Sequence, residues 1–356
     1  MRGEGRPLMA ERARRPLAPT ARIVVAGAGN IGCYIGGLLA AAGRNVVFLA
    51  RPPMAEALSA HGLHLTDLAG LDLRLAPANL TVTADPAVLG SAELILVTVK
   101  SGATDAMARE IASHAKPGPA VLSLQNGVDN LPVLRAVLGE PAPLGGMVAF
   151  NVVHPGRGRF HRGTSGDVVI ERGRDDVLAL LSVPGLKVTL TRDIAGVQWG
   201  KLLLNLNNAL NALSGLPLRR QLQDRQWRRL LADQIAEALA VLKAAGIDAV
   251  PVTPAPNAFL PALLRLPDAP FRIGAARMLR IDPEARSSMQ DDLTRRRQTE
   301  IDYLQGAVVK AAARHGLEAP LCERVALLVK QAEAAGAGPP GLKPAEIRDR
   351  HRHHGV

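Results

Sequence analysis

Three glycines early in the chain have the spacing that binds the phosphates of a dinucleotide. They stand in the order G-x-G-x-x-G directly after a short β-branched run. The first permits a tight turn, the second has no Cβ to hold a pyrophosphate away, and the third lets a following helix pack closely. The start of that helix offers N–H groups and a positive dipole end. The residues predicted to bind phosphate are Gly27, Ala28, Gly29, Asn30, Ile31 and Gly32.

The end of the next predicted strand, residues 45–50, indicates which dinucleotide binds. NAD-binding and FAD-binding domains usually carry Asp or Glu there to hold the ribose 2′-OH. This chain has no acid between Arg44 and Arg51. The Arg51 guanidinium can pair with a 2′-phosphate through two hydrogen bonds, whereas a carboxylate would repel that charge. We therefore predict NADPH as the cofactor; a solvated loop arginine is the alternative.

A second group of polar residues lies in the leucine-rich segment 199–213. Lys201, Asn205 and Asn208 are spaced i, i+4 and i+7, so they share one stripe of an α-helix. An ammonium and two amides are costly to bury among leucines without partners. The spacing therefore favours a row that faces a polar substrate, and a structural hydrogen-bond network is the alternative.

Two further polar residues follow buried strands of the N-terminal half. Apolar runs at 94–99 and 120–124 are typical of parallel strands, and they end at Lys100 and near Asn126. Because ligands sit beyond the carboxyl ends of such strands, we expect both residues to line one crevice with Arg51.

The order of elements predicts two domains of different class. Strands alternate with helices up to about residue 140, which is typical of a doubly wound parallel sheet, and a mixed β region follows over 143–190. Helical patterns dominate from about residue 193. We expect an α/β domain over 21–192, a helical domain over 193–335, a disordered extension over 1–20 and a polar tail over 336–356.

Charge and composition exclude several classes of function. The 356 residues include 43 Lys and Arg against 32 Asp and Glu, a net charge of +11, but about half of that excess lies near the two ends. No aromatic residues are interleaved with these charges, which argues against nucleic-acid binding. No run of 18 apolar residues is present, so we expect no membrane span.

Cysteine content and the chain ends complete the compositional prediction. Cys33 and Cys322 show no metal-binding or disulfide spacing, which fits a cytoplasmic protein. The arginine-rich N-terminus lacks the apolar segment of a secretory signal, and Met9 is an alternative start to Met1. Histidines near the C-terminus belong to the predicted polar tail, so no metal site is expected.

Taken together, six segments resemble the ketopantoate reductase (2-dehydropantoate 2-reductase) family over residues 21–332. They occur in the family's order and are 27–32, 96–100, 125–127, 199–205, 287–291 and 299–303. The resemblance implies an N-terminal Rossmann-type domain and an all-α C-terminal domain like that of 6-phosphogluconate dehydrogenase. It also implies a site in the cleft between the two domains.

The resemblance also implies roles for individual residues. Lys201 matches the catalytic lysine, which would protonate the developing alkoxide while NADPH delivers hydride to C2, and Glu300 matches the essential glutamate. On local chemistry alone, Glu300 would be read as a surface charge. Residues implied on the substrate side are Asn126, Asn205 and Ser288, with Asn208 added from its place on the helix; on the cofactor side they are Arg51, Lys100 and Asn126.

One departure bears on the substrate. The family often carries a second asparagine eight residues after the lysine, where this chain has Ala209, and Asn208 stands on the same face as Lys201. The expected activity is reduction of 2-dehydropantoate to pantoate in pantothenate and coenzyme A synthesis, with a small 2-oxo acid as partner and a homodimer as a candidate assembly. The alternatives are a reductase of another 2-oxo acid or imine, and a non-catalytic NADPH-binding regulator.

Overall fold

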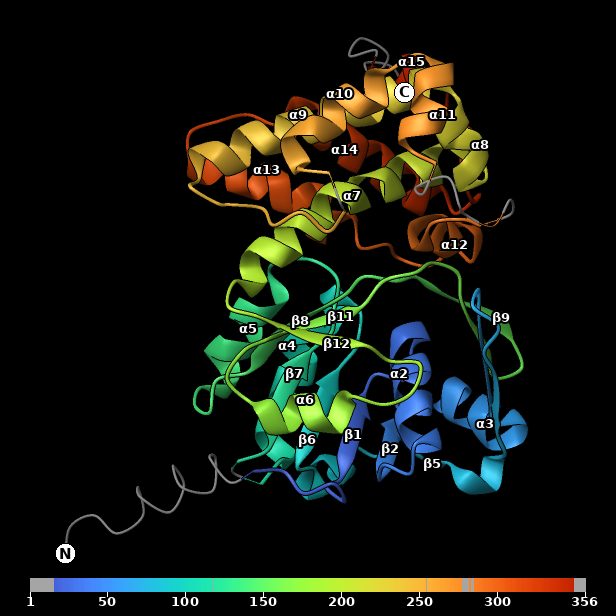
Figure 1. The fold of residues 1–356 in the computed structure, drawn as a ribbon, viewed down its shortest axis with the longest axis vertical. Coiled ribbons are helices and arrows are strands. Elements are labelled where there is room, and N and C mark those ends of the chain that lie inside the picture. Colours follow the sequence, from blue (N-terminus) through green and yellow to red (C-terminus); the bar gives the residue numbers. More distant parts are fainter. Residues whose placement is uncertain (1–15, 117, 254, 277–281, 283–284, 349–356) are drawn as a thin grey trace, which may run out of the picture. The chain divides into compact units, whose positions relative to one another are not determined.

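The structure is a computed structural model that describes residues 16–116, 118–253, 255–276, 282 and 285–348. The chain divides into two compact units, Met1–Ile194 and Ala195–Val356. Figure 1 shows an α/β first unit and a helical second unit. The predicted fold class is therefore confirmed.

The first unit is built on an eight-stranded sheet in the order β12-β11-β8-β7-β6-β1-β2-β5. From β5 to β8 all neighbours are parallel, because each connection crosses over the sheet before the next strand. The strands are β1 (Ile23–Ala26), β2 (Val46–Leu49), β5 (Thr81–Thr83), β6 (Leu94–Val97), β7 (Ala120–Ser123), β8 (Leu144–Val148), β11 (Val168–Glu171) and β12 (Val188–Thr191).

Both faces of this sheet are buried, each in its own hydrophobic core. Ile23 and Val25 of β1 belong to one core, and Val24 and Ala26 belong to the other, because successive side chains of a strand point to opposite faces. This explains why the central strands read as unbroken apolar runs in the sequence. The helices of this unit are α2 (Asn30–Ala41), α3 (Pro52–His61), α4 (Thr104–His114), α5 (Asn130–Leu138) and α6 (Asp175–Leu181), with the short 3-10 helices η1 (Pro77–Asn79), η2 (Pro86–Ser91) and η3 (Ser101–Ala103).

A second, four-stranded sheet in the same unit has the order β4-β3-β10-β9. Its central pair joins β3 and β10 in parallel, with His64 opposite Arg159, so it unites segments about ninety residues apart in sequence. The strands are β3 (Leu63–Asp67), β4 (Asp72–Leu75), β9 (Val152–Gly156) and β10 (Arg159–Arg162).

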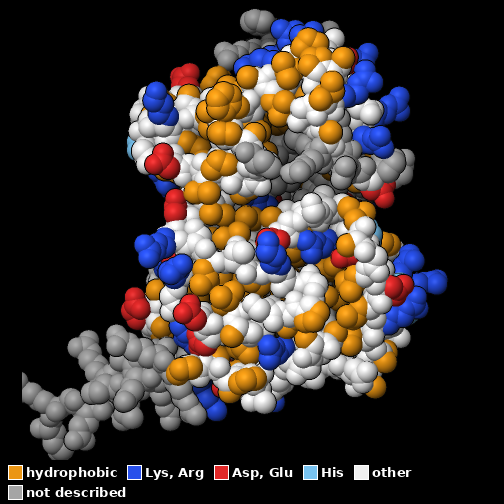
Figure 2. All heavy atoms as spheres, in the orientation of Figure 1, with side chains coloured by type: hydrophobic (Ala, Val, Ile, Leu, Met, Phe, Trp, Pro, Cys, Tyr) orange, Lys and Arg blue, Asp and Glu red, His pale blue; other side chains and the backbone are white. Residues whose placement is uncertain are grey.

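The second unit is helical and begins with α7 (Ile194–Ser214), a helix of 21 residues. Hydrophobic side chains gather on the face of this unit drawn in the upper part of Figure 2. The other elements are α8 (Leu218–Gln223), α9 (Arg225–Ala244), η4 (Asn257–Phe259), α10 (Leu260–Arg265), α11 (Asp268–Gly274), α12 (Ser288–Thr294), η5 (Ile301–Tyr303), α13 (Gln305–Arg314), α14 (Pro320–Ala335) and α15 (Pro344–Arg348).

A fully buried arginine ties four of these helices together. Arg228 of α9 donates hydrogen bonds to the backbone carbonyls of Leu222, Gln223, Leu264 and Leu266, which end α8 and α10. Its guanidinium also pairs with Asp268 at 2.7 Å and lies 4.1 Å from the ring centre of Phe271, both in α11. One side chain thus donates to backbone carbonyls at helix ends, which have no hydrogen-bond donor within their own helix.

Both predicted chain ends need correction where the structure describes them. Leu17, which we expected in a disordered extension, packs against the first core, and its N–H donates to Asp176 at 2.8 Å. In the predicted polar tail, Ile347 of α15 is fully buried, and the Leu342 N–H donates to the Leu213 carbonyl at the end of α7. Apolar residues within these polar segments supply the contacts. Residues 1–15 and the histidines at 351, 353 and 354 lie outside the described residues.

Candidate active site

The glycine turn has the geometry that its sequence predicts for phosphate binding. Gly27 adopts φ +108°, and a Cβ there would lie 2.7 Å from the backbone nitrogen of Val99. A Cβ at Gly32 would lie 2.6 Å from Thr98 Oγ1. At Gly29, in contrast, no atom of the described residues beyond its two chain neighbours stands within 4 Å of the Cβ position. Packing therefore requires the outer two glycines, whereas the middle one leaves room for a ligand against the backbone.

A threonine on the neighbouring strand holds this turn. The Thr98 N–H donates to Ala26 O at 2.9 Å, and Thr98 Oγ1 donates to Gly27 O at 2.6 Å. The helix α2 that follows has no side-chain hydrogen bond at its N-cap, Gly29. Asn30 uses its side-chain amide on Val152 O, 2.9 Å away, so its backbone N–H is the group it can offer to a phosphate. Open space beside an uncapped helix start fits a dinucleotide pyrophosphate.

The other predicted cofactor residues lie at the same edge of the sheet. Strands β1, β2, β6 and β7 are neighbours in register, so their carboxyl ends lie side by side. Arg51 follows β2 and is exposed, and Lys100 follows β6 and is exposed. Asn126 follows β7 and is half-buried, and its carbonyl accepts from Ser101 Oγ at 2.9 Å. The first unit thus brings two cations and an amide to one edge of the sheet.

On α7 in the second unit, the predicted polar row forms a single accessible stripe. Within residues 196–214, all of which the structure describes, four side chains are partly exposed and the rest are buried. The four are Lys201, Leu204, Asn205 and Asn208. Ala209 is fully buried, so the position where the family often has asparagine does not lie on this stripe, and Asn208 does.

Lys201 has an unusual acidity for a lysine. Loss of solvent around its ammonium lowers the pKa from 10.5 to about 8, and the nearby Glu300 carboxylate opposes this by raising it. The structure therefore brings together the two residues that the sequence predicted as catalytic. A pKa this close to neutrality suits a group that must hold and release a proton.

Backbone contacts in the second unit place this pair. Glu300 precedes η5, and its carbonyl accepts from the Tyr303 N–H at 3.0 Å, while the Thr299 N–H donates to Glu333 of α14 at 2.6 Å. Beside Lys201, Gly200 allows the backbone near Val250 to cross α7, because a Cβ would lie 2.9 Å from the Val250 carbonyl carbon. Close packing against the Val250 backbone therefore requires a glycine next to the lysine.

A buried amide cluster that the sequence did not reveal places the serines of α12 beside Asn208. The Asn211 amide lies 3.1 Å from Gln221 Oε1 and its carbonyl oxygen accepts from the Ser287 N–H at 2.9 Å. Ser287 is buried, caps α12 by accepting from Gln290 N, and donates to the Asn208 carbonyl at 3.0 Å. Its neighbour Ser288 is exposed. The i, i+4 pair Asn207 and Asn211 on α7 was the available signal.

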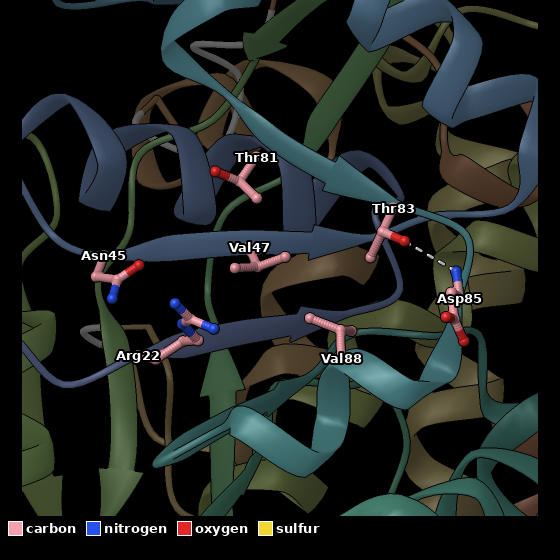
Figure 3. Close-up of a pocket in the computed structure, with 7 residues that line it drawn as sticks. All are labelled: Arg22, Asn45, Val47, Thr81, Thr83, Asp85 and Val88. Carbon is pink, nitrogen blue, oxygen red and sulfur yellow. Dashed lines mark hydrogen bonds between the residues drawn. The ribbon is translucent and has the colours of Figure 1, made fainter.

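A pocket of about 310 Å³ lies elsewhere on the large sheet. The link from β5 to β6 contains only the short η2, which covers the sheet incompletely beside Val47. None of the predicted site residues is among its lining residues, which Figure 3 shows: Arg22, Asn45, Val47, Thr81, Thr83, Asp85 and Val88.

In the part of the chain that the structure describes, no cluster of three or more His, Cys, Asp or Glu side chains could hold a metal, and no helix is long and apolar enough to cross a membrane.

Comparison with known proteins identifies relatives over nearly the whole chain. The chain is 30% identical to the 2-dehydropantoate 2-reductase of Halobacterium salinarum, covering 88% of this chain and 100% of that protein. A PanE/ApbA family ketopantoate reductase structure from Ralstonia eutropha JMP134 superimposes with a TM-score of 0.75 at 29% identity, covering 88% of this chain and 99% of that one. A D-mandelate dehydrogenase bound to NADH and anilino(oxo)acetate shares the fold, with a TM-score of 0.72 at 20% identity, over 88% and 99% of the two chains.

Family profiles agree with these relatives. The profile "Ketopantoate reductase PanE/ApbA" matches residues 23–175, and its C-terminal counterpart matches residues 193–333. The first match contains the glycine turn, Lys100 and Asn126, and the second contains Lys201 and Glu300. The chain therefore belongs to the ketopantoate reductase PanE/ApbA family.

Proposed function

We propose that this protein is an NADPH-dependent reductase that converts 2-dehydropantoate to pantoate, a step of pantothenate and coenzyme A synthesis. The observation that carries the proposal is Lys201. Its ammonium has a pKa of about 8, it is attracted by Glu300, and it stands on the accessible stripe of α7. The relatives named 2-dehydropantoate 2-reductase support this substrate.

The first unit is proposed to hold the cofactor. Backbone N–H groups of residues 28–32 would bind the pyrophosphate, and Arg51 would pair with the 2′-phosphate. Lys100 and Asn126 would fix the reactive end at the edge of the sheet. NADPH supplies a hydride for the C2 carbonyl carbon when it is bound.

Lys201 is proposed to supply the matching proton. As the carbonyl carbon gains a hydride, negative charge grows on its oxygen, and an ammonium placed there stabilises that charge and then transfers its proton to give the alcohol. The reaction balances as one hydride on carbon and one proton on oxygen. Glu300 would keep Lys201 protonated at neutral pH by raising its pKa.

Substrate recognition is proposed to use amides and a hydroxyl. Asn205 and Asn208 share the stripe with Lys201, and Ser288 follows the serine that bonds to the backbone of Asn208. These groups and Asn126 would bind the carboxylate and the hydroxyl of the substrate. Since Ala209 is fully buried, we propose that Asn208 takes the part of the family's second asparagine.

A reductase of a different 2-oxo acid is the second candidate. The shared fold of the D-mandelate dehydrogenase that binds NADH and anilino(oxo)acetate favours it over a non-catalytic regulator. The partly exposed Lys201 on α7, with Glu300 nearby, also favours a catalytic protein over a regulator that only binds NADPH. The two enzymatic functions differ in the side chain attached to the 2-oxo acid.

The decisive experiment follows NADPH oxidation by the purified protein with 2-dehydropantoate, pyruvate, 2-oxoisovalerate and phenylglyoxylate in parallel, and repeats each with NADH. We expect a kcat/KM for 2-dehydropantoate with NADPH that is at least tenfold above every other pair. Faster turnover of another acid would overturn the proposed substrate and keep the reductase. Tight NADPH binding without any turnover would overturn the enzymatic function.

Lys201→Ala tests the proton donor. We expect kcat to fall by about 10²-fold or more, because general-acid catalysis contributes roughly 10²–10⁴-fold, with little change in NADPH affinity. Lys243→Ala, at the end of α9, is the control and should leave kcat unchanged. Undiminished turnover in the Lys201 variant would assign the proton transfer to another group.

For compartment and partners, we propose a cytoplasmic enzyme without a nucleic-acid partner. Cys33 and Cys322 are both buried and form no disulfide, which fits a reducing compartment.

Two exposed apolar side chains favour a homodimer that forms through the second unit. They are Ile273 and Phe259, with 81% and 64% of their surface exposed. Sedimentation of the wild type and of Ile273→Glu would test the assembly, with a monomeric wild type contradicting it.

A further inference from the structure

Five polar side chains are buried where β6 and β7 end, directly beneath the predicted cofactor edge. The sequence analysis gave none of them a role, although Gln125 lies in the segment 125–127 that resembles the family, and the proposed reaction does not use them. They lie at the ends of the two strands and at the starts of the following helices, and they are Ser101, Thr104, Ser123, Gln125 and Asn130. Buried polar groups of this kind are retained only when hydrogen bonds satisfy them.

Gln125 links the end of β7 to the end of β6. Its Nε2 donates to the Val99 carbonyl at 3.1 Å and to Thr104 Oγ1 at 2.7 Å. Its Oε1 accepts from Ser123 Oγ at 3.0 Å. Because a carbonyl can only accept, the contact with Val99 fixes which end of the Gln125 amide carries the nitrogen.

Asn130, the first residue of α5, makes a second link between the segments that follow β6 and β7. Its Nδ2 donates to Ser101 Oγ at 3.2 Å and to the Asn126 carbonyl. Its Oδ1 lies 2.7 Å from Thr104 Oγ1. Ser101 Oγ also donates to the Asn126 carbonyl, so that carbonyl receives side-chain donors from both loops.

Thr104 is the junction of the two links. Its hydroxyl accepts from Gln125, and its single proton is directed to Asn130 Oδ1 or to the Ser101 carbonyl, 2.8 Å away. One hydroxyl therefore connects both strand ends and both helix starts. In a low-dielectric interior such a connected network is stiff, because each broken contact leaves a buried group without a partner.

The network ends on the Asn126 carbonyl and on the two chain neighbours of Lys100, next to the residues proposed to bind the cofactor. Lys100 stands between Val99 and Ser101, and both of these are held by it. The Asn126 peptide is held through its carbonyl. Since Val97 and Ser123 are partners in the β6–β7 ladder, the two loops leave the sheet at the same level. Their separation is then set by the buried hydroxyl and amides.

We propose that Thr104, acting with Gln125 and Asn130, is a positioning residue that holds Lys100 and Asn126 in the orientation needed for hydride transfer. The inference rests on the proposed reductase function, and it adds which buried side chains fix the positions of the cofactor-binding loops. Misplacing reacting groups by about 1 Å costs roughly 10²-fold in rate, so the loss of this junction is expected to be visible in catalysis.

The test compares Thr104→Val with Thr104→Ser. Valine keeps the shape and removes the hydroxyl, whereas serine keeps the hydroxyl. Thr66→Val is the matched control, because it removes a hydroxyl that contacts His161 in the small sheet of the same unit. We expect kcat/KM of Thr104→Val to fall at least tenfold at a temperature where all variants are folded by circular dichroism, and Thr104→Ser and Thr66→Val to stay within threefold of wild type.

A double-variant cycle separates positioning from general stability. If Thr104 acts through Lys100 and Asn126, then Thr104→Val should cost less than threefold in a background that carries both Lys100→Ala and Asn126→Ala. An undiminished penalty there, or equal activity of Thr104→Val and wild type, would overturn the proposal. If wild type reduces no 2-oxo acid, the proposed function fails, and the network is judged by NADPH affinity. Thr104→Val should then weaken binding several-fold relative to Thr104→Ser, and equal affinities would overturn it.

Discussion

The acidity of Lys201 is the property of a single residue that a pH profile can measure. Its pKa is lowered from 10.5 to about 8, so the ammonium is present below pH 8 and is lost as the pH rises through that value. Because the reduction needs the proton, we expect kcat/KM to be flat near neutrality and to fall tenfold per pH unit above about 8. A profile that stays flat to pH 10 would contradict this assignment.

Glu300→Gln should move that descending limb. The carboxylate raises the pKa of Lys201, so its removal lets desolvation lower the pKa further, and the fall in kcat/KM should begin at a lower pH than in wild type. Glu323→Gln, an exposed site on α14, is the control and should leave the profile in place. A limb shifted to higher pH would show that Glu300 does not act on Lys201 by charge.

Arg51 is the residue on which we expect the choice of cofactor to depend. Arg51→Ala should weaken NADPH binding by about tenfold or more and change NADH binding little, because only NADPH carries the 2′-phosphate. Titrations of cofactor fluorescence measure both affinities, with Arg109→Ala on α4 as the control. Equal losses for the two cofactors would assign Arg51 a structural role.

Residue types and spacing indicated candidate reactive positions but did not reveal the groups that support them. The stripe of Lys201, Asn205 and Asn208 could be recognised because the other residues between Lys201 and Asn208 are leucines, apart from one buried asparagine that lies off the stripe. Asn211 has the same side chain as Asn208 and is three residues away, yet it serves a buried cluster. Only the packing partner, Gln221, separates these uses, and periodicity does not reveal a partner.

Among elements, the four helices joined by Arg228 depend on one side chain. Arg228→Met should lower the free energy of unfolding of the second unit by about 2–4 kcal/mol, because it leaves several buried carbonyls without donors. Both tryptophans of the chain, Trp199 and Trp227, lie in this unit, so their fluorescence during urea unfolding reports on it. Arg265→Met, which removes a surface ion pair with Asp233, should cost about 1 kcal/mol or less. Equal losses would contradict the central role of Arg228.

The strands of the large sheet could be predicted because both faces are buried, so successive residues of each central strand are apolar. The predicted segments 94–99 and 120–124 contain β6 (Leu94–Val97) and β7 (Ala120–Ser123). The small sheet could not be predicted in the same way. Its pair β3 and β10 is joined across about ninety residues, and β3 reads Leu-His-Leu-Thr-Asp, a pattern too short and polar to indicate a partner.

At the scale of the whole molecule, the segment after the family match contributes to the second unit. The family profile ends at residue 333, whereas α15 continues to Arg348, which pairs with Asp233 of α9 at 2.6 Å. A chain that stops after residue 335 should therefore unfold at a lower temperature than wild type, as followed by tryptophan fluorescence. A chain that stops after residue 348, which keeps α15, is the control and should unfold at a higher temperature than the shorter chain. Equal midpoints for the two truncated chains would show that α15 adds no stability.

The hydrogen bond from Leu342 to the Leu213 carbonyl also has a consequence for protein synthesis. The hydrogen bond that completes the helix bearing Lys201 comes from a residue 129 positions later, so it cannot form until the ribosome has synthesised the intervening part of the second unit. The first unit is complete by residue 194 and can fold while translation continues. The end of the helix that bears Lys201 is secured only once Leu342 has been synthesised and has left the ribosome, so nascent chains should acquire cofactor binding before they acquire reductase activity.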